Sequence, residues 1–141
     1  ALTREIRKVH QYDVFSTGAP FQAGIAAFLT SEAGAAHLAE LASFYQSKRD
    51  RLLNGLRGSQ WQVSPAEGGY FQLLGYGAFD DRDDRTATAD WCTRADGWAL
   101  IPLSPFFPEG GYDSKLVRIR FAKNDDTIDR GIERLLNIAN G

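Results

Sequence analysis

The sequence contains no methionine, one cysteine (Cys92) and two histidines among its 141 residues. Because a single cysteine cannot close an intrachain disulfide, a reducing, cytoplasmic location is expected. No run approaches the roughly 18 consecutive apolar residues of a membrane-spanning helix, and no basic segment followed by an apolar one opens the chain as a secretory signal would. With no initiator methionine and a helical pattern that starts at Leu2, the chain is expected to be a piece of a longer protein.

The same scarcity removes several kinds of active site. Neither His10 nor His37 has a cysteine or carboxylate at metal-ligand spacing, so no metal site is predicted. His10 is interpreted as a helix-surface or cap residue and Cys92 as a packing residue. No serine lies in the Gly-x-Ser-x-Gly turn of hydrolases, and no glycine cluster has the spacing of a phosphate-binding loop. A net charge of -2 and an isoelectric point near 5.7 argue against a nucleic-acid partner.

What the chain does have is a succession of patterned segments that predicts a single α/β domain with additional helices. Helical spacing predicts helices at residues 2–13 and 20–29, and a long one from just after Gly34 to Gly58. The second of these is apolar nearly all round, which is typical of a helix buried in something larger. The next part of the chain predicts strands at 61–63 and 70–74 and then a charged and solvated connection at 80–85. After it we expect a helix through Ala87 and Trp91 that ends at Gly97, a strand at 98–101 halted by Pro102, and an irregular loop at 103–111. The chain should end with a strand around Arg118 and a helix capped by Asp125 or Asp126.

The stretch from Lys115 to Lys123 carries the clearest chemical signal. With a period of two, Val117, Ile119 and Phe121 fall on one face of a strand, and Leu116, Arg118, Arg120 and Ala122 on the other. Arginine presents a planar fork of donors that fits a carboxylate or a phosphate. Residue type alone leaves two interpretations open: two arginines extending from a solvated sheet face, or an anion clamp on a rigid strand.

Five stretches in the same order resemble one family, the C-terminal portion of fold-type I, pyridoxal-phosphate-dependent aminotransferases. They are Ile6-Arg7-Lys8-Val9-His10-Gln11; Phe15-Ser16 with Pro20-x-Gln22-Ala23; Gly69-Tyr70-Phe71; Ile101-Pro102-Leu103-Ser104-x-Phe106; and Val117-Arg118-Ile119-x-Phe121-Ala122-Lys123. The similarity is greatest to the methionine and kynurenine–glutamine transaminase branch. It implies a small C-terminal domain at residues 35–141, with a small mixed or antiparallel sheet covered by helices on one face. Residues 1–34 would be trailing helices of a large domain that this chain lacks.

The resemblance also assigns roles to particular residues. It makes Arg118 the arginine that binds the substrate's α-carboxylate, and it places Phe15 and Ser16 on a segment that reaches the neighbouring active site of a homodimer. Phe71 and the loop from Ile101 onward would be walls that close over the substrate, although simple packing remains an open alternative for these aromatic residues. Arg120 departs from the family, in which a small residue often stands at that position.

The implied function is transfer of an amino group between an amino acid and a 2-oxo acid, with pyridoxal 5'-phosphate as cofactor. The family's Schiff-base lysine, its phosphate contacts and the aspartate that pairs with the pyridine nitrogen would lie upstream of Leu2. The chain alone is therefore expected to be inactive and to need the rest of the same polypeptide. A free-standing amino-acid-binding or regulatory α/β module without catalysis is the alternative. The sequence leaves the preferred amino acid undecided, although the aromatic loops suit a large apolar or sulfur-containing side chain.

Overall fold

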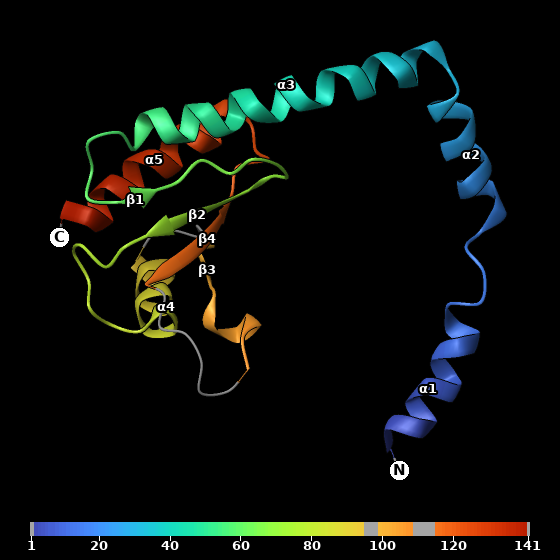
Figure 1. The fold of residues 1–141 in the computed structure, drawn as a ribbon, viewed down its shortest axis with the longest axis horizontal. Helices are drawn as coiled ribbons and strands as arrows, with labels where there is room; N and C mark the ends of the chain where they lie inside the picture. The colour runs from blue at the N-terminus through green and yellow to red at the C-terminus, as the bar shows by residue number, and fades with distance from the viewer. Residues whose placement is uncertain (1, 95–98, 109–114, 141) are drawn as a thin grey trace. The chain divides into compact units, whose positions relative to one another are not determined.

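The computed structural model describes residues 2–94, 99–108 and 115–140, which form two compact units at residues 1–42 and 43–141. Figure 1 shows the order of the elements along the chain. The helices are α1 (Leu2–Asp13), α2 (Ala19–Leu29), α3 (Glu32–Gly55), α4 (Asp84–Arg94), the short 3-10 helix η1 (Ser104–Phe106) and α5 (Asp125–Asn140); the strands are β1 (Gln62–Val63), β2 (Phe71–Gly75), β3 (Ile101–Pro102) and β4 (Leu116–Arg120). None of the described helices combines the length and the apolar character needed to cross a bilayer.

The first unit consists of helices with little buried surface of their own. The predicted helices α1 and α2 are confirmed, and Pro20 lies in the first turn of α2, where its missing N–H leaves no intrahelical hydrogen bond unmade. Neither helix contains a buried residue. On α2, Phe21 is 75% exposed and Ile25 is 61% exposed. An apolar helix of this kind cannot derive its stability from packing within the unit.

The start of α3 differs from the prediction. Gly34 was expected to precede the helix, but it is the third helical residue and donates its backbone N–H to the Ser31 side chain, which thereby acts as the helix cap. A Cβ on Gly34 would lie 1.9 Å from the Phe28 carbonyl oxygen. Glycine therefore permits the close corner between α2 and α3 rather than interrupting the helix. At the other end, α3 stops at Gly55, and Gly58 adopts a positive φ of 80° in the following turn.

The second unit is built on a four-stranded sheet in the order β1-β2-β4-β3, with every neighbouring pair antiparallel. The first two strands, β1 and β2, pair with each other as a hairpin-like unit. Pro102 was expected to halt β3 but belongs to it, opposite Val117. Proline is tolerated there because β3 is an edge strand, so no neighbouring strand on its outer side needs a backbone N–H from it. Trp98, the first residue of the predicted strand at 98–101, lies outside the described residues.

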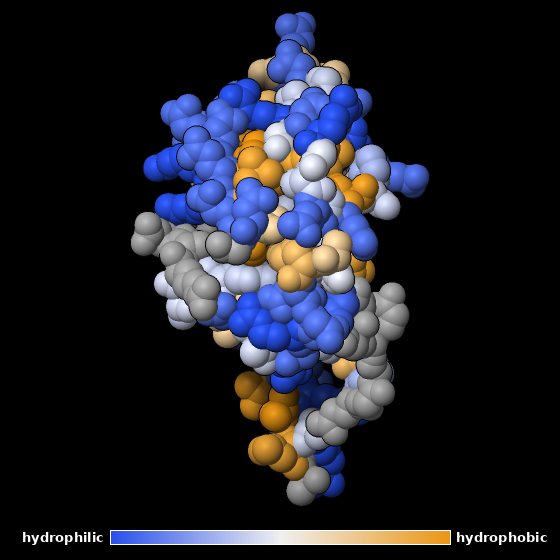
Figure 2. Space-filling model, turned by 90° about the vertical axis from the view of Figure 1, so that its left-hand side faces the viewer, coloured by the Kyte–Doolittle hydropathy of each residue, from blue (hydrophilic) through white to orange (hydrophobic). Residues whose placement is uncertain are grey.

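One face of this sheet packs against helices and forms the core. Leu74, Val117 and Ile119 are buried on that face, together with apolar residues of α3, α4 and α5. Figure 1 shows α5 beside the C-terminal half of α3, and ion pairs from Lys48 to Asp125 and from Arg51 to Asp129 join the two helices. Figure 2 shows a mostly hydrophilic surface with a few apolar residues between, as expected for helices that turn their polar sides outward. The predicted α/β class, with helices covering one sheet face, is confirmed.

Two further local predictions in this unit are wrong. The charged stretch 80–85 is not all solvated loop, because α4 begins at Asp84, which is only 4% exposed. The last helix is capped by Asn124, whose side-chain oxygen accepts the Thr127 N–H at 2.9 Å, not by either of the two aspartates that follow it. The predicted helix end at Gly97 and the end of the loop at 109–111 lie outside the described residues.

Candidate functional site

Arg118 lies near the middle of β4, a central strand, where it is opposite Leu73 of β2 and Ile101 of β3. The carbon at the centre of its guanidinium group is 4.3 Å from the ring centroid of Phe71 and 4.8 Å from that of Phe106. Phe71 comes from the paired strand β2 and Phe106 from η1. The charge thus lies over two π-systems, an arrangement that stabilises a cation and restricts its rotation.

The guanidinium group has an unused hydrogen-bond donor. The Nε atom of Arg118 is buried and has no hydrogen-bond partner in the described structure. Within the described part of the chain no carboxylate forms an ion pair with Arg118. A buried donor without an acceptor lowers the stability of the folded state by about 1–3 kcal/mol. Folding alone therefore does not favour this arrangement. An arriving anion would supply the missing acceptor.

The second arginine on this face is placed differently. Arg120 is exposed at the end of β4, and its guanidinium carbon is 5.3 Å from the ring of Tyr70. Its register partner is Phe71, one step along the same face from Leu73. The Arg118 guanidinium lies over two aromatic rings and has a buried atom, whereas the Arg120 guanidinium lies near the ring of Tyr70 and faces solvent. The two arginines are therefore not equivalent sites.

The short helix that carries Phe106 is fastened to the start of α4. The Asp84 carboxylate accepts the backbone N–H of Ser104 at 2.6 Å, and the Arg85 side chain donates to the Ser104 hydroxyl at 3.1 Å. Sequence reasoning missed Asp84 because it lies in a charged run that resembles solvated loop. The signal available was its neighbour Asp83, which caps α4 by accepting the Thr86 N–H at 3.0 Å. An aspartate at this position marks the start of a helix.

The other two predicted site residues lie in the first unit. Phe15 and Ser16 are exposed in the connection between α1 and α2, and the Phe15 side chain is 81% exposed. Arg118 and Phe71 are brought together by β2–β4 pairing, while Phe15 and Ser16 belong to a separate compact unit. An aromatic residue so exposed in a connecting segment is available for contact with another surface.

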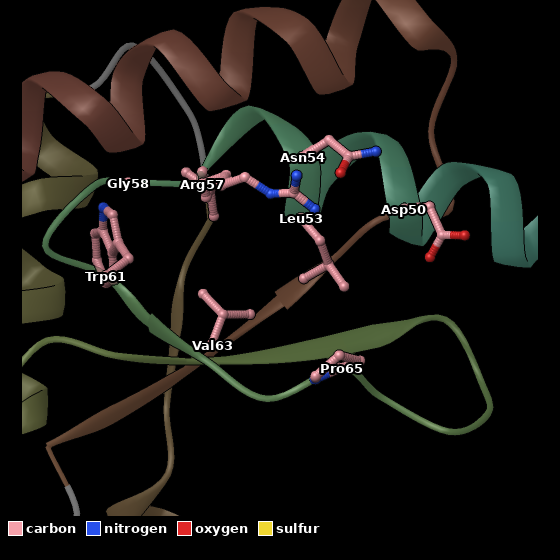
Figure 3. Close-up of a pocket in the computed structure, with 9 residues that line it drawn as sticks. Asp50, Leu53, Asn54, Arg57, Gly58, Trp61, Val63 and Pro65 are labelled. Atoms are coloured by element: carbon pink, nitrogen blue, oxygen red, sulfur yellow. The ribbon is translucent and has the colours of Figure 1, made fainter.

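The second unit has an open cavity of about 500 Å³ (Figure 3). It is formed by the end of α3, the turn after it and β1, with Leu53 and Arg57 on one side and Val63 and Pro65 on the other. Neither Arg118 nor its aromatic neighbours line it. The candidate site is thus a feature of the open sheet face, not of this cavity.

The lysines of the chain do not complete a cofactor site. All four are described: Lys8 pairs with Glu5, Lys48 with Asp125 and Lys115 with Asp81, while Lys123 is exposed after β4. A lysine that bonds to an aldehyde cofactor must present a free amine in an enclosed site. Three of these amines are in ion pairs and the fourth is exposed, so none of them fits that requirement.

No protein-family model matches the sequence. The methionine aminotransferase of Escherichia coli is 41% identical over 134 residues, which cover 95% of this chain and 34% of that protein. The kynurenine–oxoglutarate transaminase of Dictyostelium discoideum is 29% identical over 94% of this chain and 34% of its own length. The chain thus spans about a third of the length of the curated relatives it matches.

Solved structures give the same result. The Escherichia coli protein YbdL, whose crystal structure identified a methionine aminotransferase function, superposes over 95% of this chain and 34% of its own with a TM-score of 0.79 at 41% identity. N-succinyldiaminopimelate aminotransferase from Mycobacterium tuberculosis superposes over 98% of this chain and 35% of its own with a TM-score of 0.80 at 33% identity. Sequence and fold agree: over almost its whole length the chain is similar to about a third of each of these aminotransferases, the family that its motifs indicated.

Proposed function

We propose that this chain is the small domain, with adjoining helices, of a pyridoxal-phosphate-dependent aminotransferase in which Arg118 binds the substrate's α-carboxylate. The observation that carries the proposal is the Arg118 guanidinium, fixed against Phe71 and Phe106 with a buried Nε that has no partner. The full-length enzyme moves an amino group between an amino acid and a 2-oxo acid. Relatives named for methionine and kynurenine support a large apolar or sulfur-containing substrate.

The geometry suits a carboxylate better than a bulky or neutral ligand. Rings that stack on the guanidinium plane leave its in-plane N–H groups as the accessible donors, and a carboxylate accepts two of these side by side. Strand pairing on both sides of Arg118 holds the backbone that carries this donor group. Binding the carboxylate in one orientation is how this residue would present the amino group to the reacting centre.

Pyridoxal phosphate, when bound, supplies the carbonyl that accepts the amino group and the electron sink for the reaction. This chain's contribution is to hold the carboxylate and to exclude water with its aromatic residues. The lysine and the phosphate contacts would come from the rest of the polypeptide. The chain by itself should accordingly show no transaminase turnover.

The exposed apolar side chains of the first unit support the proposal that this unit packs on a large domain. Its helix α2 exposes Phe21, Ile25, Phe28 and Leu29, more apolar surface than one helix can leave in water at no cost. We assign residues 1–34 to trailing helices that pack on that domain, and residues 35–141 to the small domain. Phe15 and Ser16 would contribute to the neighbouring active site of a homodimer, which is consistent with their exposure.

Steady-state kinetics of the full-length enzyme test the role of Arg118. Arg118→Gln removes one member of a buried charge pair, at a cost of about 2–5 kcal/mol, or roughly 30-fold to several-thousand-fold in kcat/KM for the amino acid. An amine substrate that lacks the carboxylate should be unaffected. Arg118→Lys should restore only part of the activity, because lysine supplies charge without the planar fork.

Arg120→Ala is the matched control on the same strand face. It should change kcat/KM by a factor that corresponds to about 1 kcal/mol or less, as is usual for an exposed charge. Greater damage from Arg120→Ala, or equal damage from Arg118→Gln to the amine and the amino acid, would overturn the assignment. Tight binding of an amino acid by the 141-residue chain alone would instead favour the non-catalytic binding module.

A further inference from the structure

Asp84 is a buried acid in the first turn of α4. It is the first residue of α4 and is 4% exposed, yet it forms no ion pair with any described residue. Placing a carboxylate out of water is unfavourable unless hydrogen bonds compensate. The bond that compensates here comes from η1, since the Ser104 backbone N–H donates to the Asp84 Oδ2 atom at 2.6 Å.

Ser104 is held at a second point by the neighbouring residue. The Arg85 Nε–H donates to the Ser104 hydroxyl at 3.1 Å. Two consecutive residues of α4 therefore bind the main chain and the side chain of the residue that begins η1. Loop segments usually move more than the elements they join, so this double attachment gives η1 a defined position on α4.

The attachment leads directly to the carboxylate site. Phe106 closes η1, and its own N–H donates to the Leu103 carbonyl at 2.9 Å. Phe106 is 59% exposed, and its ring centroid lies 4.8 Å from the guanidinium carbon of Arg118. Because so much of the residue is in solvent, the η1 backbone contributes more than core packing to where the ring lies. Phe71 differs in this respect, since strand pairing with β4 holds it in place.

We propose that Asp84 is a positioning residue for the carboxylate site: it fixes η1, and through Phe106 it restricts the orientation of the Arg118 guanidinium. The proposal rests on the proposed function of Arg118 as the carboxylate ligand. Without Asp84, η1 loses its main-chain attachment and Phe106 leaves the guanidinium, while Phe71 stays. Arg118 then samples more orientations and binds the carboxylate less well, but chemistry after binding is unchanged.

The kinetic test uses the full-length enzyme with an amino acid and with an amine that lacks the carboxylate. Asp84→Ala should raise KM for the amino acid about tenfold with little change in kcat, and should leave the amine unaffected. Asp84→Asn keeps an acceptor for the Ser104 N–H and should restore most of the affinity. Phe106→Ala should give a similar defect, and the double variant should be no worse than either single one.

Asp83→Ala is the matched control. Asp83 caps the same helix turn by accepting the Arg85 and Thr86 N–H groups and forms no hydrogen bond with Ser104 in the described structure. It reproduces any general loss of α4 stability without releasing η1. If Asp83→Ala raises KM for the amino acid as much as Asp84→Ala does, or if Asp84→Ala harms the amine equally, the positioning role is wrong.

A spectroscopic readout separates this proposal from the role of Arg118. In the ¹⁵N-labelled 141-residue chain, the Arg118 Nε–H signal should shift on Asp84→Ala and return toward its original position on Asp84→Asn, because the ring current of Phe106 is lost and regained. If Arg118→Gln spares amino-acid turnover, the proposed function fails, and this shift still decides whether Asp84 positions the ring. An Arg118 signal unchanged by Asp84→Ala would overturn the proposal.

Discussion

The two faces of the four-stranded sheet differ in what covers them, although their residues alternate along the same strands. On β2, Leu74 is fully buried beneath the helices, and the adjacent Leu73 is 42% exposed on the other face. On β4, Val117 is fully buried, whereas Arg118 is partly exposed between two aromatic rings. The covered face is optimised for packing, and the open face keeps apolar and cationic groups available. Exposed apolar and cationic groups gathered on one face are typical of a binding surface.

The largest expected difference between the faces is in stability. Leu74→Ala leaves a cavity in a packed core and should lower the free energy of unfolding by about 2.7–5 kcal/mol. Leu73→Ala, one residue away on the same strand, should cost about 1 kcal/mol or less because much of its side chain is already in water. Chemical denaturation of the 141-residue chain measures both. Similar losses for the two variants would show that the open face is also packed.

The next prediction concerns Gln72, the polar side chain that β2 buries on the covered face. It is 1% exposed, accepts the Ala66 N–H at 3.0 Å and donates to the Ser64 carbonyl at 2.7 Å. Gln72→Leu keeps the volume but leaves backbone groups of the β1–β2 connection without partners, at a cost of about 1–3 kcal/mol by denaturation. The exposed Gln62 is the control, and Gln62→Leu should be close to neutral. A neutral Gln72→Leu would mean that water replaces the amide.

Acid should weaken the attachment of α5 to α3 on the covered face. The Lys48 and Arg51 side chains of α3 hold the pKa values of Asp125 and Asp129 on α5 below their ordinary range, by hydrogen bonding first and by charge second. A carboxyl whose pKa is lowered by folding adds stability above its unfolded pKa of about 3.9, and that stability is lost as pH falls through the lower, folded value.

Thermal unfolding at a series of pH values between about 5 and 2 measures this contribution. The double variant Asp125→Asn and Asp129→Asn should show a shallower decline below pH 4 than the original chain, and the two curves should converge at the acid end. These groups are exposed, so the effect is small and decreases with added salt. A decline of unchanged steepness would show that other carboxyls dominate acid unfolding.

The smallest expected effect is that of Arg120→Ala on stability. Arg120 is exposed and contacts the ring of Tyr70, so its loss should change the free energy of unfolding by about 0.5 kcal/mol, within the usual range for surface sites. A loss above about 2 kcal/mol, measured by denaturation, would mean that Arg120 holds the open face together. Its role in the kinetic comparison with Arg118 would then need a different control.

Much of the fold could be predicted from local pattern. The helices α1, α2 and α5 and the two faces of β4 follow from the spacing of apolar residues, because that spacing decides which side of an element can be buried. The errors had two causes. Some were local: glycine is needed at Gly34 to fit the Phe28 carbonyl, and Asn124, not the aspartate after it, caps the last helix. Asp84 is different, because its partner Ser104 lies 20 residues further along the chain and cannot be identified from the neighbouring sequence.

The candidate site divides in the same way. The sequence by itself determined that β4 carries Arg118 on a face opposite Val117 and Ile119, since alternation along a strand is a property of the backbone. Only the tertiary structure decided that Phe71 and Phe106 meet at that guanidinium, that its Nε has no partner in the described chain, and that η1 is attached to α4. The physical reason is that strand pairing and loop attachment bring together residues far apart in sequence, and no local periodicity records which of them will touch.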